Sequence, residues 1–582
     1  MKSDKIVFII LLLVGFSVFF NGLKGDFVHD DLLVLSHSFF SQSAKVLNFF
    51  SEPYFEDFYQ AGLYRPLTQI SFRLNFLFGS SPFSFHLVNI LLHIINSFLI
   101  YLLVSKIINS DGRIRIPERS PQGRSEVALF ACLLFLVLPI HVEAVTSIVG
   151  RAELFSFLFG ILTLLLWLDT KYFFSAITLF LALLSKESAI AVMPIIFLLN
   201  WYHRFTPTLI HEWWGRGWRW LFYYLGAAIF YFTLRFIVLG QYAFKAQVEF
   251  IFNPLAYASL FERFWTALKI LILYLAKVFV PYRLSADYSY DQIPIVTNLF
   301  SSPSALVGLV VLGLMLRAIY RVSQRKVSVF VWALILFLMP YLVISNLIFP
   351  TGTIMGERLM YFSSLGAVMI LALVIERLFK FSKRAGVIFL LILLVVYGLL
   401  TISQNRVWMS REALLTDIFK KSPDSVVAKT EYGILVLNED KELAKKLSLE
   451  VYEKYPGYVQ NLNLRAAVEI QEGNLKEAEK FLERALELRS KHQNTLQNLS
   501  RVYFTLGKYP ETEERLKVLV SEYGGTGNVI FYALVQAKNN HFEQSRQTIY
   551  DFFGPDVKDE SALKILRKEY KEVEEFFIFH KQ

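Results

Sequence analysis

The sequence is almost without cysteine. Cys132, inside an apolar segment, is the only one among 582 residues. A lone cysteine excludes an intrachain disulfide and a thiolate metal cluster. Charged residues are also few, at 19% of the chain, whereas hydrophobic residues make up 55% and the mean hydropathy is +0.44. This balance excludes an ordinary soluble globular protein.

The formal net charge of +10 would fit a nucleic-acid partner, but the position of the charges does not. Lysine and arginine cluster in short loops between apolar segments, at 106–124, 203–219, 321–326 and 380–384. Loops of this kind are explained by the positive-inside rule for membrane proteins. We therefore expect membrane lipid around the chain and no nucleic acid.

The apolar segments predict an all-α, polytopic membrane domain over residues 1–403. Most are long enough to cross a hydrocarbon core of about 30 Å as helices. The first resembles a signal peptide, but its length and the poor cleavage site at 21–24 predict a retained helix. The twelve candidate spans are 6–23, 84–106, 126–143, 153–169, 172–185, 188–202, 219–239, 264–281, 303–320, 328–349, 359–378 and 385–403.

If all the basic loops lie in the cytoplasm, three parts of the chain lie on the other side of the membrane. They are the first loop (24–83), the loop at 345–358, and everything beyond about 403. The number of candidate spans between the basic loops at 203–219 and 321–326 is odd, where an even number is required. We expect the segment 264–281, which contains Lys269 and Lys277, to be interfacial or re-entrant. About eleven crossings remain.

After a linker at 404–424, residues 425–582 form a predicted repeat domain. Gly473 and Gly507 are 34 residues apart, and Ala444 and Ala478 share a small position in the same phase. A period of 34 residues predicts tetratricopeptide repeats, here about four units. Their concave surface normally binds an extended peptide or another protein. The alternative is a plain helical cap that stabilises the membrane domain.

Asp30 and Asp31 are adjacent carboxylates just outside the first apolar segment. Adjacent residues of a helix diverge by about 100°, so only one can point directly at a reacting atom. The other would cap the helix, hold a divalent ion or orient its neighbour. A carboxylate at a partly dehydrated boundary has a raised pKa and is a better general base. The alternative is structural, with Asp30 as a helix N-cap and Asp31 in the first turn.

Polar residues also form a stripe on the span at 84–106. His86, Asn89, His93 and Asn96 are separated by 3, 4 and 3 residues, which places them on one helix face. In lipid, that face turns toward other helices or toward a wet cavity. The two histidines are about 10 Å apart along the axis, too far to share a metal unaided. Interhelical hydrogen bonding is the favoured interpretation.

Charged residues recur at the span ends that are expected outside, although a charge costs roughly 2.5–3.5 kcal/mol at the bilayer centre. They predict a shared polar cavity near the outer face, where arginine or lysine would neutralise a phosphate leaving group. Taken singly, each is more often a structural ion pair or an interface anchor. The residues are His141, Glu143, Arg151, Glu153, Lys186, Glu187, Glu357 and Arg358.

In order along the chain, these motifs resemble those of the C-class polytopic glycosyltransferases. The resemblance is closest to the transmembrane and tetratricopeptide-repeat O-mannosyltransferase family and its bacterial relatives. The matching stretches are 27–31, 64–68, 71–75, 85–93, 138–145, 149–154, 185–188 and 356–361, with the repeats behind them. No single stretch is decisive; their order is.

The resemblance implies transfer of a sugar, mannose in the named family, from a polyprenyl-phosphate donor to a protein hydroxyl at the non-cytoplasmic face. The catalytic base would be Asp30 or Asp31, with a preference for Asp30. Arg65, Arg151, Lys186 and Arg358 would lie around the donor phosphate. The short repeat array and the aromatic and acidic stretch at 54–59 depart from the family, so acceptor and sugar stay open.

The mechanistic hypothesis is a single displacement with inversion at the sugar carbon. No metal is required, and an ion held by Asp30 and Asp31 would be Mg or Mn. Two other classes stay open: a non-enzymatic scaffold that recruits envelope proteins through the repeats, and a lipid or polymer transporter. We expect a bacterial inner membrane, with the repeats in the periplasm binding an exported protein or peptide acceptor.

Overall fold

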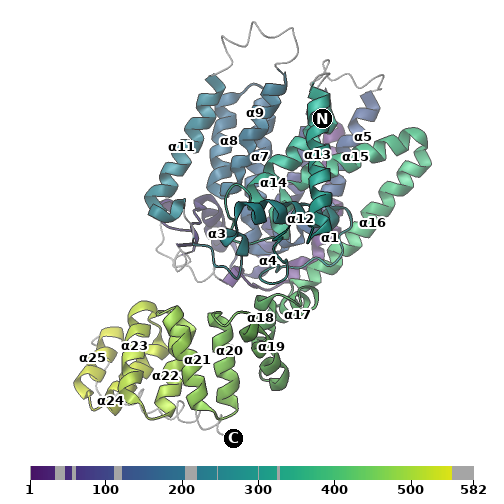
Figure 1. Cartoon of the computed structure of the whole chain (residues 1–582). Helices are drawn as coiled ribbons and strands as arrows, with labels where there is room; N and C mark the ends of the chain where they lie inside the picture. The colour runs from purple at the N-terminus through teal and green to yellow at the C-terminus, as the bar shows by residue number, and fades with distance from the viewer. Residues whose placement is uncertain are drawn as a thin grey trace. The chain divides into compact units, whose positions relative to one another are not determined.

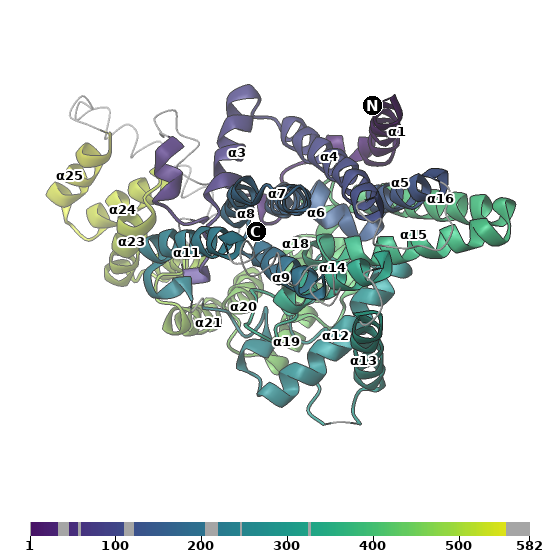
Figure 2. The same cartoon turned by 90° about the horizontal axis from the view of Figure 1, so that it is seen from above.

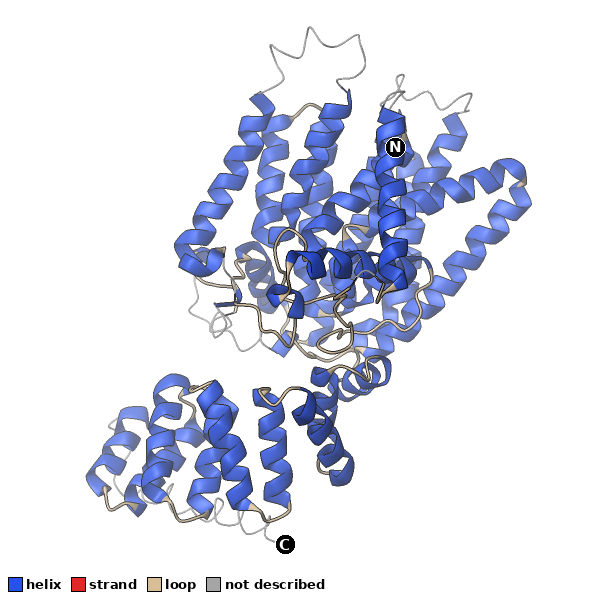
Figure 3. Ribbon diagram, viewed as in Figure 1, coloured by secondary structure: helices blue, strands red, loops and turns tan. Residues whose placement is uncertain are grey.

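The computed structural model describes residues 2–32, 46–55, 60–109, 121–203, 219–244, 247–298, 300–323 and 328–553. Within these ranges the regular elements are all helices, so the predicted all-α class is confirmed (Figure 3). The chain divides into two compact units, Met1–Ser425 and Val426–Gln582, which we call the membrane unit and the repeat unit (Figure 1).

The membrane unit contains fifteen α-helices in its described part. They are α1 (Lys2–Phe19), α3 (Pro66–Phe78), α4 (Pro82–Asn109), α5 (Pro121–Val137), α6 (Val142–Thr146), α7 (Arg151–Leu168), α8 (Tyr172–Ser185), α9 (Val192–His203), α11 (Arg219–Leu239), α12 (Leu260–Phe279), α13 (Pro303–Ser323), α14 (Val329–Ile344), α15 (Ser364–Phe381), α16 (Lys383–Val407) and α17 (Arg411–Lys421). Short 3-10 helices join them: η1 (Phe20–Lys24), η3 (Val46–Phe50), η5 (Pro139–His141), η6 (Ile148–Gly150), η7 (Glu187–Ala191), η9 (Gly240–Ala243), η10 (Pro254–Tyr257) and η11 (Glu357–Tyr361).

Each of the twelve predicted apolar segments contains a helix. By length and composition, six helices in the described residues are able to cross a membrane, or up to seven if one bent pair is a single span. The six are Asp4–Lys24, Pro82–Asn109, Ile148–Leu168, Leu221–Ala243, Pro303–Arg321 and Lys383–Val407. Three further apolar helices are shorter than 18 residues. The count of eleven crossings therefore stays a prediction.

The segment 126–143 differs from the single straight span that the sequence predicts. Helix α5 ends at Val137, and the chain continues through η5 and α6 at an angle of 53° to it. The cause is Pro139, because the residue before a proline avoids helical dihedral angles. Leu138 is accordingly extended, with φ −70° and ψ 119°. The bend brings His141 and Glu143 into the interior of the unit.

Helix α12 covers the segment that was expected to be interfacial or re-entrant. It begins with a capping box, in which the Ser259 side chain and the Glu262 side chain each bond the other's backbone N–H. In Figure 2, which looks down the axes of α7 and α8, α12 lies across the direction of those helices. Helix α12 is not among the described helices that are long and apolar enough to cross a membrane; an interfacial or re-entrant position stays a prediction.

Two segments outside the predicted spans are more regular than the sequence suggested. The loop after the first span contains α3, which starts at Pro66 in the first turn, where the missing N–H costs nothing. The segment 404–424, expected as a linker, consists of the end of α16 and of α17. It belongs to the membrane unit, where the Ser422 hydroxyl donates to the Asp287 carbonyl over 2.6 Å.

The repeat unit consists of four helix pairs in its described part. Its helices are α18 (Val426–Val436), α19 (Lys441–Lys454), α20 (Val459–Gln471), α21 (Leu475–Leu488), α22 (Gln493–Thr505), α23 (Tyr509–Tyr523), α24 (Thr526–Lys538) and α25 (Phe542–Phe553). Gly473 and Gly507, the pair that revealed the period, have φ +80° and +76° at equivalent corners. Ala444 and Ala478 are fully buried between helices. The predicted helical-repeat architecture is therefore present.

Candidate active site

The loop that carries Asp30 and Asp31 is hydrogen-bonded to the chain at the end of α16. The N–H of Asp26 donates to the carbonyl of Met409 over 3.1 Å. His29 has a left-handed backbone, with φ +54°, a conformation that is uncommon for residues other than glycine. The turn at His29 sends the next two side chains in different directions.

Asp30 forms a partly exposed ion pair. Both terminal nitrogens of Arg358 lie 3.2 Å from its Oδ2 atom, and His29 Nδ1 lies 2.9 Å from its Oδ1 atom. The Asp30 side chain is 28% exposed. Burial by itself would raise the pKa of Asp30, but His29 and Arg358 hold it well below its usual range. Asp30 therefore carries a negative charge and remains accessible to a ligand.

Asp31 is directed into the protein and is only 1% exposed. Its Oδ1 atom accepts hydrogen bonds from the Val149 N–H over 3.0 Å and from the Ser147 hydroxyl over 3.3 Å. Its Oδ2 atom accepts from the Val28 N–H over 3.3 Å. Burial raises the pKa of Asp31 to about 7. Its contacts are those of a residue that holds the first loop against the turn before α7.

Arg358 is oriented by a second carboxylate. Its backbone N–H donates to Glu143 Oε2 over 2.9 Å, and its Nε atom lies 3.4 Å from Glu143 Oε1. Glu143 is 6% exposed and lies on α6, beyond the bend at Pro139. The neighbouring Glu357 turns away and accepts from the Ser285 N–H over 2.8 Å and from the Tyr288 hydroxyl. Asp30, Glu143 and Arg358 thus form one cluster.

Two further ion pairs share the turn between α8 and η7. Arg65, just before α3, binds Glu187 through two parallel hydrogen bonds of 2.7 and 3.0 Å. Lys186 forms an ion pair with Glu153 of α7, and both of these side chains are 8% exposed. For Arg65, burial is outweighed by the Glu187 carboxylate, so its pKa is raised. Two of the predicted phosphate-binding cations therefore lie side by side.

Arg151 is enclosed at the start of α7, with no exposed surface. Its guanidinium donates to the side-chain oxygens of Asn89 and Asn75, each over 2.8 Å, and to two backbone carbonyls. A Cβ atom on the preceding Gly150 would lie 2.2 Å from the Ala144 carbonyl oxygen, so only glycine fits this turn. Through these hydrogen bonds, Arg151 joins α3, α4 and α7. A role in phosphate binding stays a prediction.

The polar stripe of α4 connects this helix to other segments. Its four residues are at most 1% exposed. His86 bonds the Gly25 carbonyl, and Asn89 donates to the Ser147 carbonyl. The His93 ring bonds the Tyr361 hydroxyl over 2.7 Å, and Asn96 donates to the Leu154 carbonyl. His141 joins this network through Ser364, over 2.7 Å. The stripe therefore links α4 to the segments that carry the candidate site.

Sequence reasoning missed two tyrosines next to the predicted site residues. Tyr54 lies under the guanidinium of Arg65, and Tyr288 donates to Glu357. Neither stands out in the sequence, because each belongs to a loop with other aromatic residues. Only the fold brings Tyr288, 69 residues away in the chain, next to Glu357.

The residues present do not fit a metal held by Asp30 and Asp31. The Asp31 oxygens accept from backbone and serine donors, while those of Asp30 face a guanidinium and an imidazole. In the described part of the chain, no group of three or more His, Cys, Asp or Glu is arranged to hold a metal ion.

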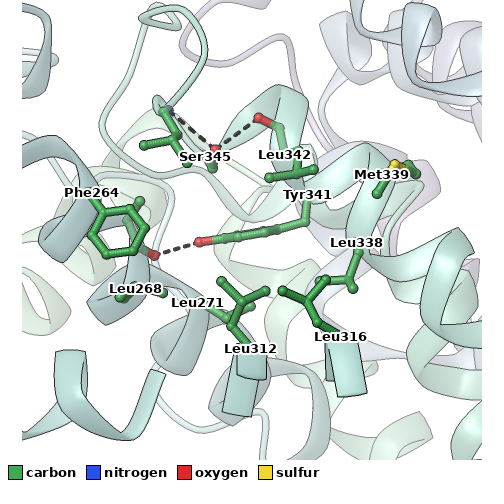
Figure 4. Close-up of a pocket in the computed structure, with 12 residues that line it drawn as sticks. Phe264, Leu268, Leu271, Leu312, Leu316, Leu338, Met339, Tyr341, Leu342 and Ser345 are labelled. Atoms are coloured by element: carbon green, nitrogen blue, oxygen red, sulfur yellow. Dashed lines mark hydrogen bonds between the residues drawn. The ribbon is translucent and has the colours of Figure 1, made fainter. Parts of the chain in front are cut away.

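A cavity of ≈ 210 Å³ lies between α12, α13 and α14 (Figure 4). Its lining is apolar apart from Tyr341 and Ser345, and both of these use their hydroxyls internally, on the Ala267 and Leu342 carbonyls. One wall residue, Leu316, is 53% exposed, which places part of this wall on the surface of the membrane unit. A ligand in this cavity would therefore contact mainly apolar side chains.

The fold and the site define an integral membrane protein with a helical-repeat tail and a charged cluster outside the first span. A family model described as "Coatomer epsilon subunit" matches residues 447–549, within the repeat unit. Three similar proteins are Protein O-mannosyl-transferase TMTC1 of Homo sapiens, 26% identical over 78% of this chain, TMTC3 of Homo sapiens, 27% over 77%, and Tmtc3 of Drosophila melanogaster, 25% over 78%.

These matches confirm the resemblance to the transmembrane and tetratricopeptide-repeat O-mannosyltransferases; a relation to bacterial members stays a prediction. The chain spans between 51% and 56% of the length of these three relatives. What the relatives' names say of their activity is therefore carried to this chain only as a proposal.

Proposed function

We propose that this protein is a membrane glycosyltransferase that moves a sugar from a polyprenyl-phosphate donor to a protein hydroxyl. The single observation that carries the proposal is the accessible Asp30 carboxylate paired with Arg358. One side chain is suited to remove a proton, and the other to bind the phosphate that leaves. The relatives' names supply mannose as the sugar and protein as the acceptor.

The proposed reaction is a single displacement. Asp30 removes the proton of the acceptor hydroxyl, and the oxygen forms a bond to the anomeric carbon of the sugar. The bond from that carbon to the phosphate oxygen breaks, and its electron pair leaves with the lipid phosphate. Because the acceptor attacks from the side opposite the phosphate, the sugar carbon is inverted.

The ion pair with Arg358 couples donor binding to the strength of the base. In the pair, Arg358 adds to the lowering of the Asp30 pKa, of which His29 is the larger cause, and so further weakens Asp30 as a proton acceptor. A donor phosphate that draws the guanidinium away from Asp30 would leave the carboxylate more basic. Arg65 and Lys186 are the other cations predicted around the phosphate.

The lipid chain of the donor needs an apolar surface next to its phosphate site. The cavity of Figure 4 is a candidate, because its wall residue Leu271 belongs to the same helix as Lys277, which pairs with Glu357. Leu271 and Lys277 are about 9 Å apart along the axis of α12. Lys277 Nζ lies 3.7 Å from Glu357, the residue before Arg358.

The proposal places Asp30, Arg358 and the repeat unit on the non-cytoplasmic side, which is the periplasm if the membrane is a bacterial inner membrane. The repeat unit would bind the exported protein or peptide acceptor. Scaffold and transporter functions would leave no new glycosidic bond, so mass spectrometry of acceptor peptides separates them from transfer.

Two neighbouring variants test the assignment of the base. Asp30→Asn keeps the shape of the side chain but removes the proton acceptor, so we expect transfer to fall by about 10²–10⁴-fold. The melting temperature should fall as well, because the ion pairs of Asp30 with Arg358 and His29 are lost. Asp31→Asn is the matched control: because its carboxylate receives backbone bonds, we expect a shifted melting temperature and retained transfer. Transfer by Asp30→Asn at the wild-type rate would refute the assignment.

A further inference from the structure

The Tyr54 hydroxyl is an unsatisfied polar group inside the candidate site. The residue is 2% exposed, and its hydroxyl has no hydrogen-bond partner among the described residues. A buried hydroxyl without a partner is unfavourable, and such groups are rare in folded proteins. Where one is found beside a binding site, a ligand that bonds it explains its presence.

The position of Tyr54 is rigid. Its N–H donates to the Leu63 carbonyl over 2.9 Å, and Gln69 donates to the Pro53 carbonyl over 2.9 Å. Its ring packs with Phe72, Phe85, Ile148 and Val149 in one buried cluster. Val149 is also the residue whose N–H binds Asp31. The tyrosine is therefore fixed against the turn that holds the paired carboxylates.

Charged groups of both signs surround the Tyr54 side chain. The guanidinium of Arg65 lies 5.2 Å from the centre of its ring. Burial raises the pKa of Tyr54, while Arg65 and Arg358 lower it and Asp30 and Asp31 raise it further. Tyr54 is thus within electrostatic reach of Arg65 and Arg358, two of the four cations predicted around the phosphate, and of both carboxylates.

We propose that Tyr54 is a donor-binding residue whose hydroxyl donates a hydrogen bond to the phosphate of the lipid-phosphate sugar. This inference rests on the proposed function and adds a contact that neither the motifs nor the relatives supply. The phosphate would lie between Arg65, held in place by Glu187, and Arg358, held in place by Glu143. Tyr54 would contribute a neutral donor between the two cations.

The test compares Tyr54→Phe with Tyr64→Phe, using the full chain in detergent and polyprenyl phosphate without sugar as the probe. Tyr64 is a matched control because it is equally buried, but its hydroxyl is satisfied by the Phe50 carbonyl over 2.9 Å. For Tyr54→Phe we expect a Kd for polyprenyl phosphate that is roughly 10- to 100-fold higher, the worth of a hydrogen bond to a charged group. We also expect a higher melting temperature without ligand, because an unsatisfied hydroxyl is removed. Tyr64→Phe should do the opposite, with a lower melting temperature and an unchanged Kd.

The outcomes separate this inference from the proposed function. Equal Kd values for the wild type and Tyr54→Phe would overturn the inference and leave the donor class intact. No binding of polyprenyl phosphate by the wild type would overturn both. Tyr54→Phe could instead raise the KM for the lipid-phosphate sugar and leave the Kd for polyprenyl phosphate unchanged. That result would mean that Tyr54 contacts the sugar, and it would refute the phosphate assignment.

Discussion

At the scale of single residues, the two neighbouring aspartates illustrate what a sequence predicts about a site. Their adjacency indicates that they cannot both face one reacting atom. Which of them faces outward depends on Val149 and Arg358, which are distant in the chain and come close only through the fold. The hydroxyl of Tyr54 is a further case, since the absence of a partner is a property of packing and not of sequence.

The buried carboxylate and its neighbours predict how stability depends on pH. The pKa values of Asp31, Glu357 and His29 are raised to about 7, 8 and 9, the first two by burial and the third by Asp30. A group whose pKa is higher in the folded state stabilises the fold below its unfolded pKa and loses that contribution as pH rises through the folded value. All three groups therefore lower the stability of the folded state as pH rises.

We expect the melting temperature of the protein in detergent to fall as pH rises from about 7 to about 9. Below about pH 6.5 this effect is opposed by histidines such as His492, whose pKa partial burial lowers to about 4. Asp31→Asn should reduce the early part of this fall and leave the later part, because Asp31 is half titrated at about pH 7, whereas Glu357 and His29 are half titrated at about pH 8 and 9. The comparison is made by thermal unfolding of both proteins across the range. A melting temperature that rises over this interval would contradict the burial of these groups.

At the scale of helices, periodicity predicts where elements lie but not how they bend or end. The apolar segments mark twelve helices, and the 34-residue period marks the helix pairs of the repeats. The bend after α5 follows from Pro139, a local signal that the length of the apolar run concealed. Helix α3 lies in the segment 24–83, where the apolar runs alone predict a loop, because its apolar face is short and interrupted by Arg73 and Asn75.

The repeat corners give a prediction about glycine. A Cβ atom on Gly473 would meet nothing within 4 Å, so an alanine there is disfavoured by its φ of +80° alone. We expect Gly473→Ala to cost about 1–2 kcal/mol and Gly473→Asn to cost less, because asparagine tolerates this conformation. Hydrogen exchange of the α20 and α21 amides in the full chain measures the difference.

Gly457 is the matched control for that measurement. It lies in a break between repeats, its φ is not positive, and a Cβ atom there would make only an ordinary contact of 3.8 Å with Tyr455. We expect Gly457→Ala to leave the exchange of α20 and α21 nearly unchanged. If both alanine variants lose the same protection, the left-handed corner is not the cause.

At the scale of the whole molecule, the proposed function requires one compartment for the first loop, the loop before η11 and the repeats. Within the membrane unit, the bond from Asp26 to Met409 joins the end of the first span to the end of α16. Because α16 is long and apolar enough to cross, its start at Lys383 is expected on the other side. The basic loop at 380–384 then faces the cytoplasm, as the positive-inside rule requires.

Single cysteines test this arrangement in a background without the natural one, which Cys132→Ala provides. Lys24→Cys reports on the first loop, Lys480→Cys, at a side chain that is 69% exposed, reports on the repeats, and Lys383→Cys reports on the basic loop. In sealed vesicles treated with a membrane-impermeant maleimide, we expect positions 24 and 480 to be labelled together. Position 383 should be labelled only after the vesicles are opened. Labelling of positions 24 and 480 from opposite sides would separate the base from the acceptor-binding repeats, and a transferase that uses both could not work.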